Sequence, residues 1–307
     1  MSNKWFVVVN PRSGGGRSAK DWPEIARLLT EAGIEYQAQF TEFQGHAITV
    51  AGEAIRRGYK HILAVGGDGT ANEVVNGLFY QNAIASHNIT FGLIPVGTGN
   101  DWIRTIGIPA GYREAILALA SGKTILQDVG IARFFRENEI HKRYFINVSG
   151  MGYDAMVASQ TNRLKQKGRG NPIWYLWSLF LCLLKYKHTL VKVAVDQKEL
   201  EGHVFSLSVG IGKFNGGGMM QLPKALPDDG FYDVTVIHKI GKLDIIRNIR
   251  NLYDGTFISH PQVTVLRGKK ISVSSKPQIF LEVDGELVGH SSVEYDILPG
   301  SLRVVVA

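Results

Sequence analysis

The sequence is poor in cysteine and in long apolar runs. Its 307 residues contain one cysteine, Cys182, which excludes an intrachain disulfide and a multi-cysteine zinc site. The longest apolar stretch, residues 173–184, is about 12 residues long, whereas a helix needs about 20 to span a bilayer. No signal peptide is visible, because the first apolar run stops at Asn10. We therefore expect a cytoplasmic protein that does not cross a membrane.

Acidic side chains are outnumbered by basic ones, 27 against 34, which makes the net charge +7. This excess favours an anionic partner (nucleic acid, an anionic membrane or a phosphorylated ligand), although it also serves plain solubility. The nine histidines show no metal-binding spacing such as His-Glu-x-x-His. Charge alone therefore leaves the partner open.

Strands and helices alternate through residues 1–125. Apolar periodicity and glycine stops predict strands at 5–10, 34–40, 61–65 and 90–95, and helices at 22–32, 47–57, 71–79 and 111–121. This βαβα order indicates a doubly wound α/β domain, in which a parallel sheet has helices on both faces.

Short β-rich segments follow from residue 126. Strands are expected at 127–134, 141–148, 191–195, 203–209, 231–237, 262–266, 271–274, 279–283 and 302–306. Helices are expected only at 153–167, 174–185 and 243–252. We predict a mostly antiparallel β-sandwich over residues 126–300, with a terminal strand in 301–307 that returns to the first domain.

Three glycine-rich loops follow strands of the first domain. They are residues 10–16 (Asn-Pro-Arg-Ser-Gly-Gly-Gly), 66–70 (Gly-Gly-Asp-Gly-Thr) and 97–101 (Gly-Thr-Gly-Asn-Asp). At the carboxyl ends of parallel strands, backbone N–H groups and helix dipoles attract anions. The first loop is not a Walker A motif, because no Lys-Ser or Lys-Thr closes it.

An acid stands in each of the last two loops. The glycines could serve only the backbone geometry of a strand-to-helix turn, and Thr70 with Glu73 forms a capping-box pattern for the next helix. Geometry does not explain Asp68 and Asp101, which would repel phosphate unless a cation bridged them. Magnesium prefers such hard oxygen ligands. The pattern therefore favours a magnesium-nucleotide site.

Asn10-Pro11 with Ser13-Gly14, followed by the 66–70 and 97–101 loops, resembles the diacylglycerol kinase catalytic-domain family. That family includes bacterial soluble lipid kinases, sphingosine kinases and ceramide kinases. The resemblance covers essentially the whole chain and is closest to the bacterial soluble members. NAD kinases and phosphofructokinases share a related second loop but lack the first motif combined with the third.

The resemblance implies an ATP site on a phosphofructokinase- or NAD kinase-like first domain. Its residues would be Asn10, Ser13, Gly14, Gly15, Thr41, Gly66, Gly67, Asp68, Gly69, Thr70, Asn72, Thr98 and Asn100. Thr41 is included because Thr41-x-x-x-Gly45-His46-Ala47 matches the family's stretch before its second helix. Asp68, Asp101 and Asp128 are the candidate ligands of Mg²⁺.

Acids also gather in residues 282–286, Glu-Val-Asp-Gly-Glu. Taken alone, Asp284-Gly285 is first a hairpin-turn signal. The resemblance reverses this interpretation, because the family keeps Asp-Gly-Glu here and one of these acids is the expected general base. On a strand, Asp284 and Glu286 would face the same side. With Asp68 they form the candidate catalytic set, and the base is left open between the two.

The loop 226–231, Leu-Pro-Asp-Asp-Gly-Phe, also indicates a turn first. In the resembling bacterial enzymes a loop of this pattern binds a second, structural magnesium. Its ligands here would be the Asp229 carboxylate and the backbone carbonyls of Leu226 and Phe231, with Asp228 as the other possible carboxylate.

A basic cluster precedes an aromatic run. The cluster is Arg163, Lys165, Lys167 and Arg169, and the run is 173–181. This combination suits a membrane interface, although a buried helix behind a solvated charge run explains it equally well. We expect a lipid substrate and a peripheral position on the anionic inner membrane face, with no nucleic-acid partner. The oligomeric state is open, a homodimer included.

The sequence thus favours a magnesium-dependent enzyme that transfers the γ-phosphoryl group of ATP to a lipid hydroxyl, with diacylglycerol converted to phosphatidic acid. The alternatives are an NAD kinase-like enzyme for a soluble substrate and a kinase for sphingoid or ceramide-type lipids. A catalytically silent binder of lipid or nucleic acid is a further alternative, against which the acids at the loops argue.

Overall fold

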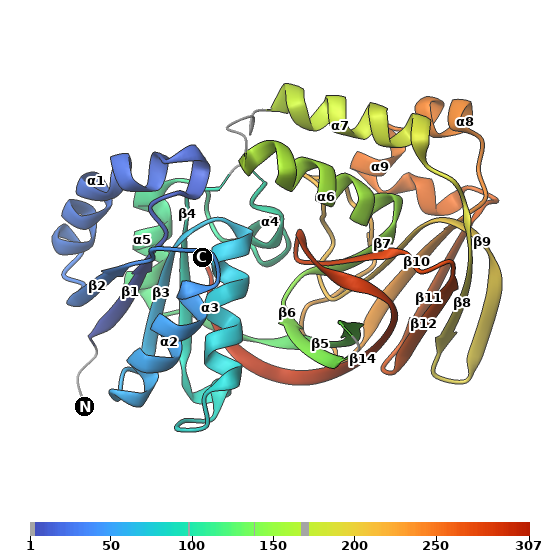
Figure 1. The fold of residues 1–307 in the computed structure, drawn as a ribbon. Helices are drawn as coiled ribbons and strands as arrows, with labels where there is room; N and C mark the ends of the chain where they lie inside the picture. Colours follow the sequence, from blue (N-terminus) through green and yellow to red (C-terminus); the bar gives the residue numbers. More distant parts are fainter. Residues whose placement is uncertain (1–3, 98, 138, 167–171) are drawn as a thin grey trace. The chain divides into compact units, whose positions relative to one another are not determined.

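The computed structural model describes residues 4–97, 99–137, 139–166 and 172–307 (Figure 1). The chain divides into two compact units, Met1–Val129 with Pro299–Ala307, and Gly130–Leu298. The sequence had indicated a boundary near residue 125. Strands β5 (Thr124–Arg136) and β14 (Glu286–Val305) contribute residues to both units.

The first unit contains a parallel sheet. Its strands are β1 (Trp5–Val9), β2 (Tyr36–Phe40), β3 (His61–Gly66) and β4 (Thr90–Pro95), in the order β4-β3-β1-β2. The end of β14 pairs with β4 in parallel, where Arg303 lies opposite Thr90. β2 lies on one side of β1 and β3 lies on the other, so the strand order reverses between β1 and β3. In open α/β sheets, ligands bind at the carboxyl ends of the strands at such a switch point.

Helices cover both faces of this sheet (Figure 1). They are α1 (Arg17–Glu31), α2 (His46–Arg56), α3 (Asp68–Tyr80), α4 (Asp101–Ile106) and α5 (Tyr112–Ser121), with short 3-10 turns η1 (Ser13–Gly15) and η2 (Ser86–Asn88). Val7 and Val9 of β1 pack with Ile25 of α1 and Ile116 of α5 in one core cluster. Alternate residues of a strand face opposite sides, so Val8 points toward the other face.

Two predicted helix starts in this unit were wrong. The helix expected at 22–32 begins at Arg17, with Pro23 inside it. The polar residues 17–21 showed no apolar period, and the proline suggested a later start. The helix expected at 71–79 begins at Asp68, because β3 continues to Gly66 and Gly67 alone separates the strand from the helix.

The second unit is antiparallel and β-rich. Its strands are β5, β6 (Glu139–Phe145), β7 (Val148–Gly152), β8 (Thr189–Val195), β9 (Lys198–Gly210), β10 (Tyr232–His238), β11 (Val263–Gly268), β12 (Ile271–Lys276), β13 (Phe280–Val283) and β14. A path runs β11-β10-β9-β7-β13-β14, while β8 and β12 connect β9 to β14. Alternating Val191, Val193 and Val195 of β8 lie in one large buried cluster. The predicted fold class, an α/β domain followed by an antiparallel β-rich domain, is confirmed.

Helices of this unit are α6 (Tyr153–Gln166), α7 (Pro172–Lys185), α8 (Lys242–Arg247) and α9 (Asn251–Asp254), with the 3-10 turn η3 (Thr256–Ser259). The single helix expected at 243–252 is therefore two short ones. The strand expected at 141–148 is also divided, into β6 and β7, with Ile146 and Asn147 between them. The described residues contain no helix long and apolar enough to cross a membrane.

Candidate active site

Ser13 connects the three glycine-rich loops of the first unit. Its Oγ accepts a hydrogen bond from the Gly67 N–H at 2.9 Å and donates to the Val96 carbonyl at 3.5 Å. Asn10 donates from Nδ2 to Thr70 Oγ1 at 2.9 Å. Parallel pairing puts the ends of β1, β3 and β4 at one sheet edge, and these side chains then tie the loops together.

Glycine is required where these loops approach one another. Gly14 has φ +62°, and a Cβ there would collide with the Val96 carbonyl oxygen. A Cβ on Gly97 would lie 2.7 Å from the Gly67 Cα, so the second and third loops are in backbone contact. Side chains at these positions would force the loops apart.

Asp68 and Asp101 converge on Gly99. A Cβ added to Gly99 would lie 3.3 Å from Asp68 Oδ2 and 3.7 Å from Asp101 Oδ2. Asp68 also accepts hydrogen bonds from the N–H groups of Asp101 and Trp102, at 3.1 and 3.2 Å, across the start of α4. The space left by the missing side chain is thus bordered by two carboxylate oxygens, a donor set that suits Mg²⁺.

The other predicted nucleotide residues lie around this edge or beneath it. The Thr41 N–H donates to the Val9 carbonyl at 2.8 Å, which puts Thr41 just beyond β2. Asn100 has φ 51° and its Oδ1 is buried with no hydrogen-bond donor among the described residues, so a ligand donor would fit there. Asn72 is fully buried in α3, where its Oδ1 accepts from Asn76 Nδ2 at 3.1 Å. Thr98 lies outside the described residues.

The capping box predicted for Thr70 and Glu73 is wrong. The residue that precedes α3 is Gly67, which has no side chain to cap the helix. The Glu73 carboxylate instead accepts hydrogen bonds from the N–H groups of Gly45 and Ala47, at 2.8 and 3.3 Å, at the start of α2. An acid beside the positive end of a helix stabilises that end, and here the helix belongs to a different part of the sequence.

Asp128 is fully buried on β5. Its Oδ1 accepts a hydrogen bond from the Gly300 N–H at 2.7 Å, next to the part of β14 that returns to the sheet. This contact gives Asp128 a role in joining the terminal strand to the first unit.

Asp284 and Gly285 form a two-residue turn between β13 and β14. Their φ values are 47° and 82°, as a type I′ turn requires, and Val283 pairs with Glu286 across it. Asp284 and Glu286 are therefore not alternate residues of one strand, and the prediction that they share a face on that ground was wrong.

The Asp284 carboxylate binds three consecutive backbone N–H groups. Oδ2 accepts from Ile146 at 3.0 Å, and Oδ1 accepts from Asn147 at 3.0 Å and from Val148 at 3.2 Å. These bonds hold the bend that divides the expected strand 141–148 into two. Asp284 thus has a structural function in the second unit.

Glu282 begins a buried polar network that the sequence did not reveal. Its carboxylate accepts hydrogen bonds from Gly285 N–H at 2.7 Å and from Asn215 Nδ2 at 3.0 Å. The network continues from Asn215 through Gln221 and Ser208 to Asp154 in the first turn of α6, and Asp154 also accepts a hydrogen bond from Ser206. Its members come from β9, β13, α6 and a loop, so no local motif could have found them.

Burial raises the pKa of Glu282 to about 8. The N–H of Gly285 and the amide of Asn215 lower this pKa, while the nearby carboxylates of Asp154 and Asp284 raise it. Burial also raises the pKa of Asp154 to about 6, against hydrogen bonds from neighbouring polar side chains. Both acids therefore hold a proton more tightly in the folded chain than in the unfolded one.

We expect the free energy of unfolding to fall as the pH rises from about 5 to 8. A carboxyl group whose pKa is raised by folding contributes its full stabilisation below its unfolded pKa of 4.5. This stabilisation is lost as the pH rises through its folded pKa of about 8. Each such group gives a slope of up to about 1.4 kcal/mol per pH unit. Glu282→Gln stays neutral, so its stability in urea should vary less with pH. The exposed Glu201→Gln is the control, and an unchanged slope in Glu282→Gln would refute the raised pKa.

Known proteins match both units. The diacylglycerol kinase catalytic domain matches residues 4–132, and the YegS C-terminal NAD kinase beta sandwich-like domain matches residues 147–306. The diacylglycerol kinase of Bacillus subtilis is 30% identical over 300 residues, which are 98% of this chain and 95% of the relative. That of Staphylococcus saprophyticus is 30% identical over 289 residues, 94% of this chain and 90% of the relative.

The chain belongs to the diacylglycerol kinase family. The resemblance inferred from its motifs is thereby confirmed, and the chain is a member of a kinase family. A crystal structure of a diacylglycerol kinase from Bacillus anthracis superposes with a TM-score of 0.73 at 22% identity, covering 99% of this chain and 97% of that one. Yeast NADH kinase superposes with a TM-score of 0.55 at 11% identity, covering 100% and 84%. These two likenesses show the shared fold.

The loop 226–231, predicted to hold a structural Mg²⁺, has its Asp229 carboxylate bound by groups of the protein itself. Asp229 forms an ion pair with Arg267, and its Oδ1 accepts from the Phe231 N–H at 3.0 Å. Arg267 and Lys269 lie over the Phe231 ring, 4.5 and 4.7 Å from its centre. A guanidinium already neutralises the carboxylate, so a bare cation would have to displace it.

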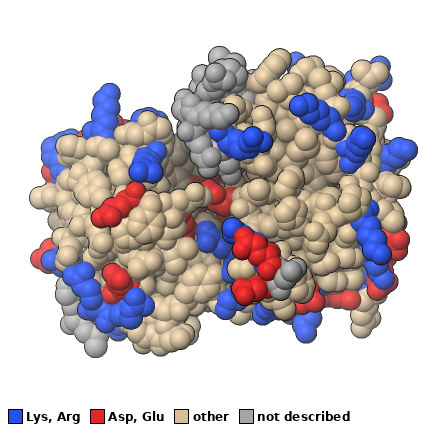
Figure 2. Space-filling model, in the orientation of Figure 1, with Lys and Arg blue, Asp and Glu red and all other residues tan. Residues whose placement is uncertain are grey.

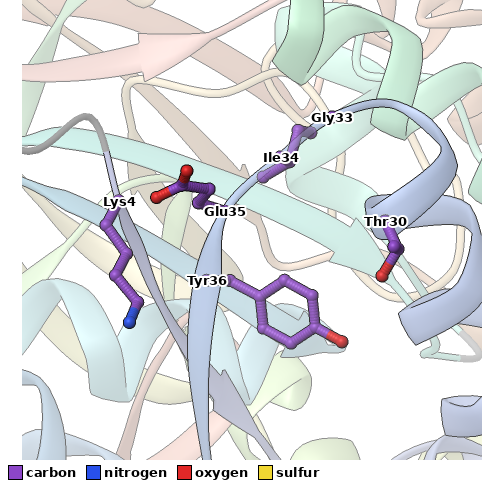
Figure 3. Close-up of a pocket in the computed structure, with 6 residues that line it drawn as sticks. All are labelled: Lys4, Thr30, Gly33, Ile34, Glu35 and Tyr36. Atoms are coloured by element: carbon purple, nitrogen blue, oxygen red, sulfur yellow. The ribbon is translucent and has the colours of Figure 1, made fainter.

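A separate hollow lies at the other end of the first unit's sheet (Figure 3). It has a volume of about 450 Å³ and is lined by Lys4, Thr30, Gly33, Ile34, Glu35 and Tyr36. Thr30 lies near the end of α1, and the other lining residues lie at the amino ends of β1 and β2. Ligands of doubly wound sheets bind at the carboxyl ends, so this hollow is not the candidate active site.

Proposed function

We propose that this chain is a magnesium-dependent lipid kinase that transfers the γ-phosphoryl group of ATP to the hydroxyl of diacylglycerol. The convergence of Asp68 and Asp101 on Gly99, at the edge where three glycine-rich loops meet, is the observation that carries the proposal. Family membership supports a kinase, and the relatives' designation as diacylglycerol kinases supports this acceptor.

The first unit supplies the nucleotide half of the chemistry. First-turn N–H groups of α3 lack intrahelical acceptors and favour phosphate oxygens. Asp68 and Asp101 would hold Mg²⁺, which would neutralise charge on the transferred phosphoryl group. Gly14, Gly67 and Gly97 keep the loop backbones close enough together to form one surface for the phosphates.

The second unit supplies the proton acceptor. Asp284 is committed to backbone N–H groups, so the general base that we propose is Glu286, the first residue of β14. Its carboxylate would accept the proton that the acceptor hydroxyl loses as its oxygen bonds to phosphorus.

The proposal is tested by incubating the chain with radiolabelled ATP and Mg²⁺ in mixed micelles of diacylglycerol. We expect labelled phosphatidic acid, with mass spectrometry to identify the product. Parallel reactions with NAD, ceramide and a sphingoid base test the alternatives, and label in one of these instead of diacylglycerol would replace the acceptor named here. Absence of transfer to every acceptor would contradict a kinase function.

We also propose that a surface formed by α7 and α8 contacts the anionic inner face of the membrane. Trp177, Phe180 and Leu184 are exposed along α7 at helical spacing, and Leu243 and Ile246 are exposed on α8. Lys242 Nζ donates to the Leu184 carbonyl at 2.7 Å, which joins the two helices. Leu183 of α7 lies in a buried cluster, and the half-buried Ile245 of α8 packs against it, so the exposed residues turn away from this cluster.

The charge of the two segments also supports contact with an anionic membrane. Residues 177–188 and 239–254 contain six Lys or Arg and two acids. Figure 2 shows blue groups among tan ones over α7 and α8, with little red. Apolar side chains beside cations suit an anionic lipid surface, where each basic residue contributes about 1 kcal/mol. Of the basic cluster predicted from the sequence, Arg163 is exposed, while Lys167, Arg169 and the side chain of Lys165 lie outside the described residues.

Replacing Leu243 and Ile246 by serine should weaken binding to phosphatidylglycerol vesicles by about tenfold or more. Both side chains are exposed, so the melting temperature should change little. Leu117→Ser, a leucine of similar exposure on α5, is the matched control and should bind normally (59% exposed, against 69% for Leu243). Sedimentation with the vesicles measures this, and equal binding by the double variant and the control would refute the surface.

A further inference from the structure

Glu282 holds the turn from which the proposed base emerges. It lies on β13, 1% exposed, and its Oε2 accepts a hydrogen bond from the Gly285 N–H at 2.7 Å. We propose that Glu282 is a positioning residue, which fixes the backbone of the Asp284–Gly285 turn and thereby the place of Glu286. This inference rests on the proposed function of Glu286.

The strand pairing leaves the Gly285 N–H available to such an acceptor. The last pair of the hairpin is Val283 with Glu286, so the Gly285 N–H lies beyond the ladder. Gly285 is exposed, and Glu282, from three residues upstream, gives its N–H a fixed acceptor within the protein in place of water. Asn215 Nδ2, at 3.0 Å from Oε1, orients the same carboxyl group from the other side.

The two turn residues are thus held independently. Asp284 is fixed through its carboxylate by Ile146, Asn147 and Val148, and Gly285 is fixed through its N–H by Glu282. With both residues before it anchored, the backbone of the proposed base has little freedom. A base displaced by about 1 Å loses on the order of 100-fold in rate, so this anchoring matters for turnover more than for binding.

Gly150 makes room for the Glu282 carboxyl. Gly150 lies opposite Glu282 in the pairing of β7 with β13, and a Cβ on it would be 2.5 Å from Oε1. The same Cβ would be 3.2 Å from the Cβ of Asp154. Gly150→Ala should therefore displace the carboxyl group while leaving the acid itself in the chain.

The experiment compares Glu282→Leu, Glu282→Gln and Gly150→Ala with the wild type. Thr235→Val is the matched control, because it removes a buried hydrogen bond of the same unit, 3.0 Å to the Gln221 carbonyl. We expect kcat to fall about 100-fold in Glu282→Leu and Gly150→Ala, with KM for ATP within about twofold. In Glu282→Gln the amide oxygen can still accept the Gly285 N–H, so the loss should be within about tenfold.

Amide hydrogen exchange of residues 280–290 provides a readout that needs no substrate. The Gly285 amide should exchange about tenfold faster in Glu282→Leu and Gly150→Ala than in the wild type, Glu282→Gln or Thr235→Val. Unchanged exchange and turnover in Glu282→Leu would overturn the inference, as would equal losses in the Gln and Leu variants. If the wild type transfers phosphate to no acceptor, the proposed function fails, and the exchange rates alone decide whether Glu282 holds the turn.

Discussion

Asp68→Asn should lower kcat about 1000-fold in the lipid phosphorylation assay. The substitution removes one of the two negative charges that converge on Gly99, where Mg²⁺ would neutralise the transferred phosphoryl group. Stability should fall only slightly, by about 1 kcal/mol, because the amide oxygen can still accept one of the two N–H bonds at the start of α4.

The matched control is Asp21→Asn, another acid of the first unit. Its carboxylate accepts from Tyr112 Oη at 2.7 Å and lies in α1, outside the glycine-rich loops. Turnover should remain near the wild-type value. Calorimetric titration with MgATP gives a second readout, in which Asp68→Asn should bind more weakly than Asp21→Asn. Similar turnover in the two variants would remove Asp68 from the site.

Asp284 and Glu286 should respond to substitution in opposite ways. Asp284→Ala leaves three buried N–H groups without their acceptor and puts alanine at φ 47°, so we expect the free energy of unfolding to fall by about 3–5 kcal/mol. Glu286→Gln should leave it within about 0.5 kcal/mol of the wild type. That variant should nevertheless lose about 1000-fold in kcat, as expected for a general base.

Urea unfolding and steady-state kinetics of both variants separate the two roles. Asp284→Asn refines the test, because asparagine tolerates positive φ and keeps one acceptor oxygen. It should recover part of the lost stability. If Asp284→Asn is as stable as the wild type but inactive, while Glu286→Gln is active, then Asp284 is the base and the assignment to Glu286 is wrong.

The convergence of the three glycine-rich loops could be predicted from the sequence because its signals are local. Each glycine-rich loop directly follows an apolar strand, and parallel strands bring their carboxyl ends to one edge. Asp68 and Asp101 were therefore expected to lie close together, and they do. The contact of Glu73 with α2 was missed. The capping pattern Thr70-x-x-Glu73 can be seen within four residues, whereas the Gly45 N–H that binds Glu73 in the structure is 28 residues away.

The acids of the second unit show the opposite case. Asp284-Gly285 was correctly recognised as a turn signal, but the expectation that Asp284 and Glu286 face the same side assumed that both lie on one strand. The partners of Asp284 are more than 130 residues away, and Asn215, which binds the Glu282 carboxylate, is 67 residues away in a loop. Such pairs depend on strand register, which a single sequence does not specify.

The sequence by itself determined the two-part architecture, the family and the three glycine-rich loops, because periodicity, glycine and acids act over a few neighbouring residues. Only the tertiary structure decided which acids are structural. Asp284 and Glu282 lie within four residues of the proposed base in the chain. Their functions nevertheless depend on backbone N–H groups that the turn and the strand pairing bring to them. A buried carboxylate takes its function from the donors that surround it.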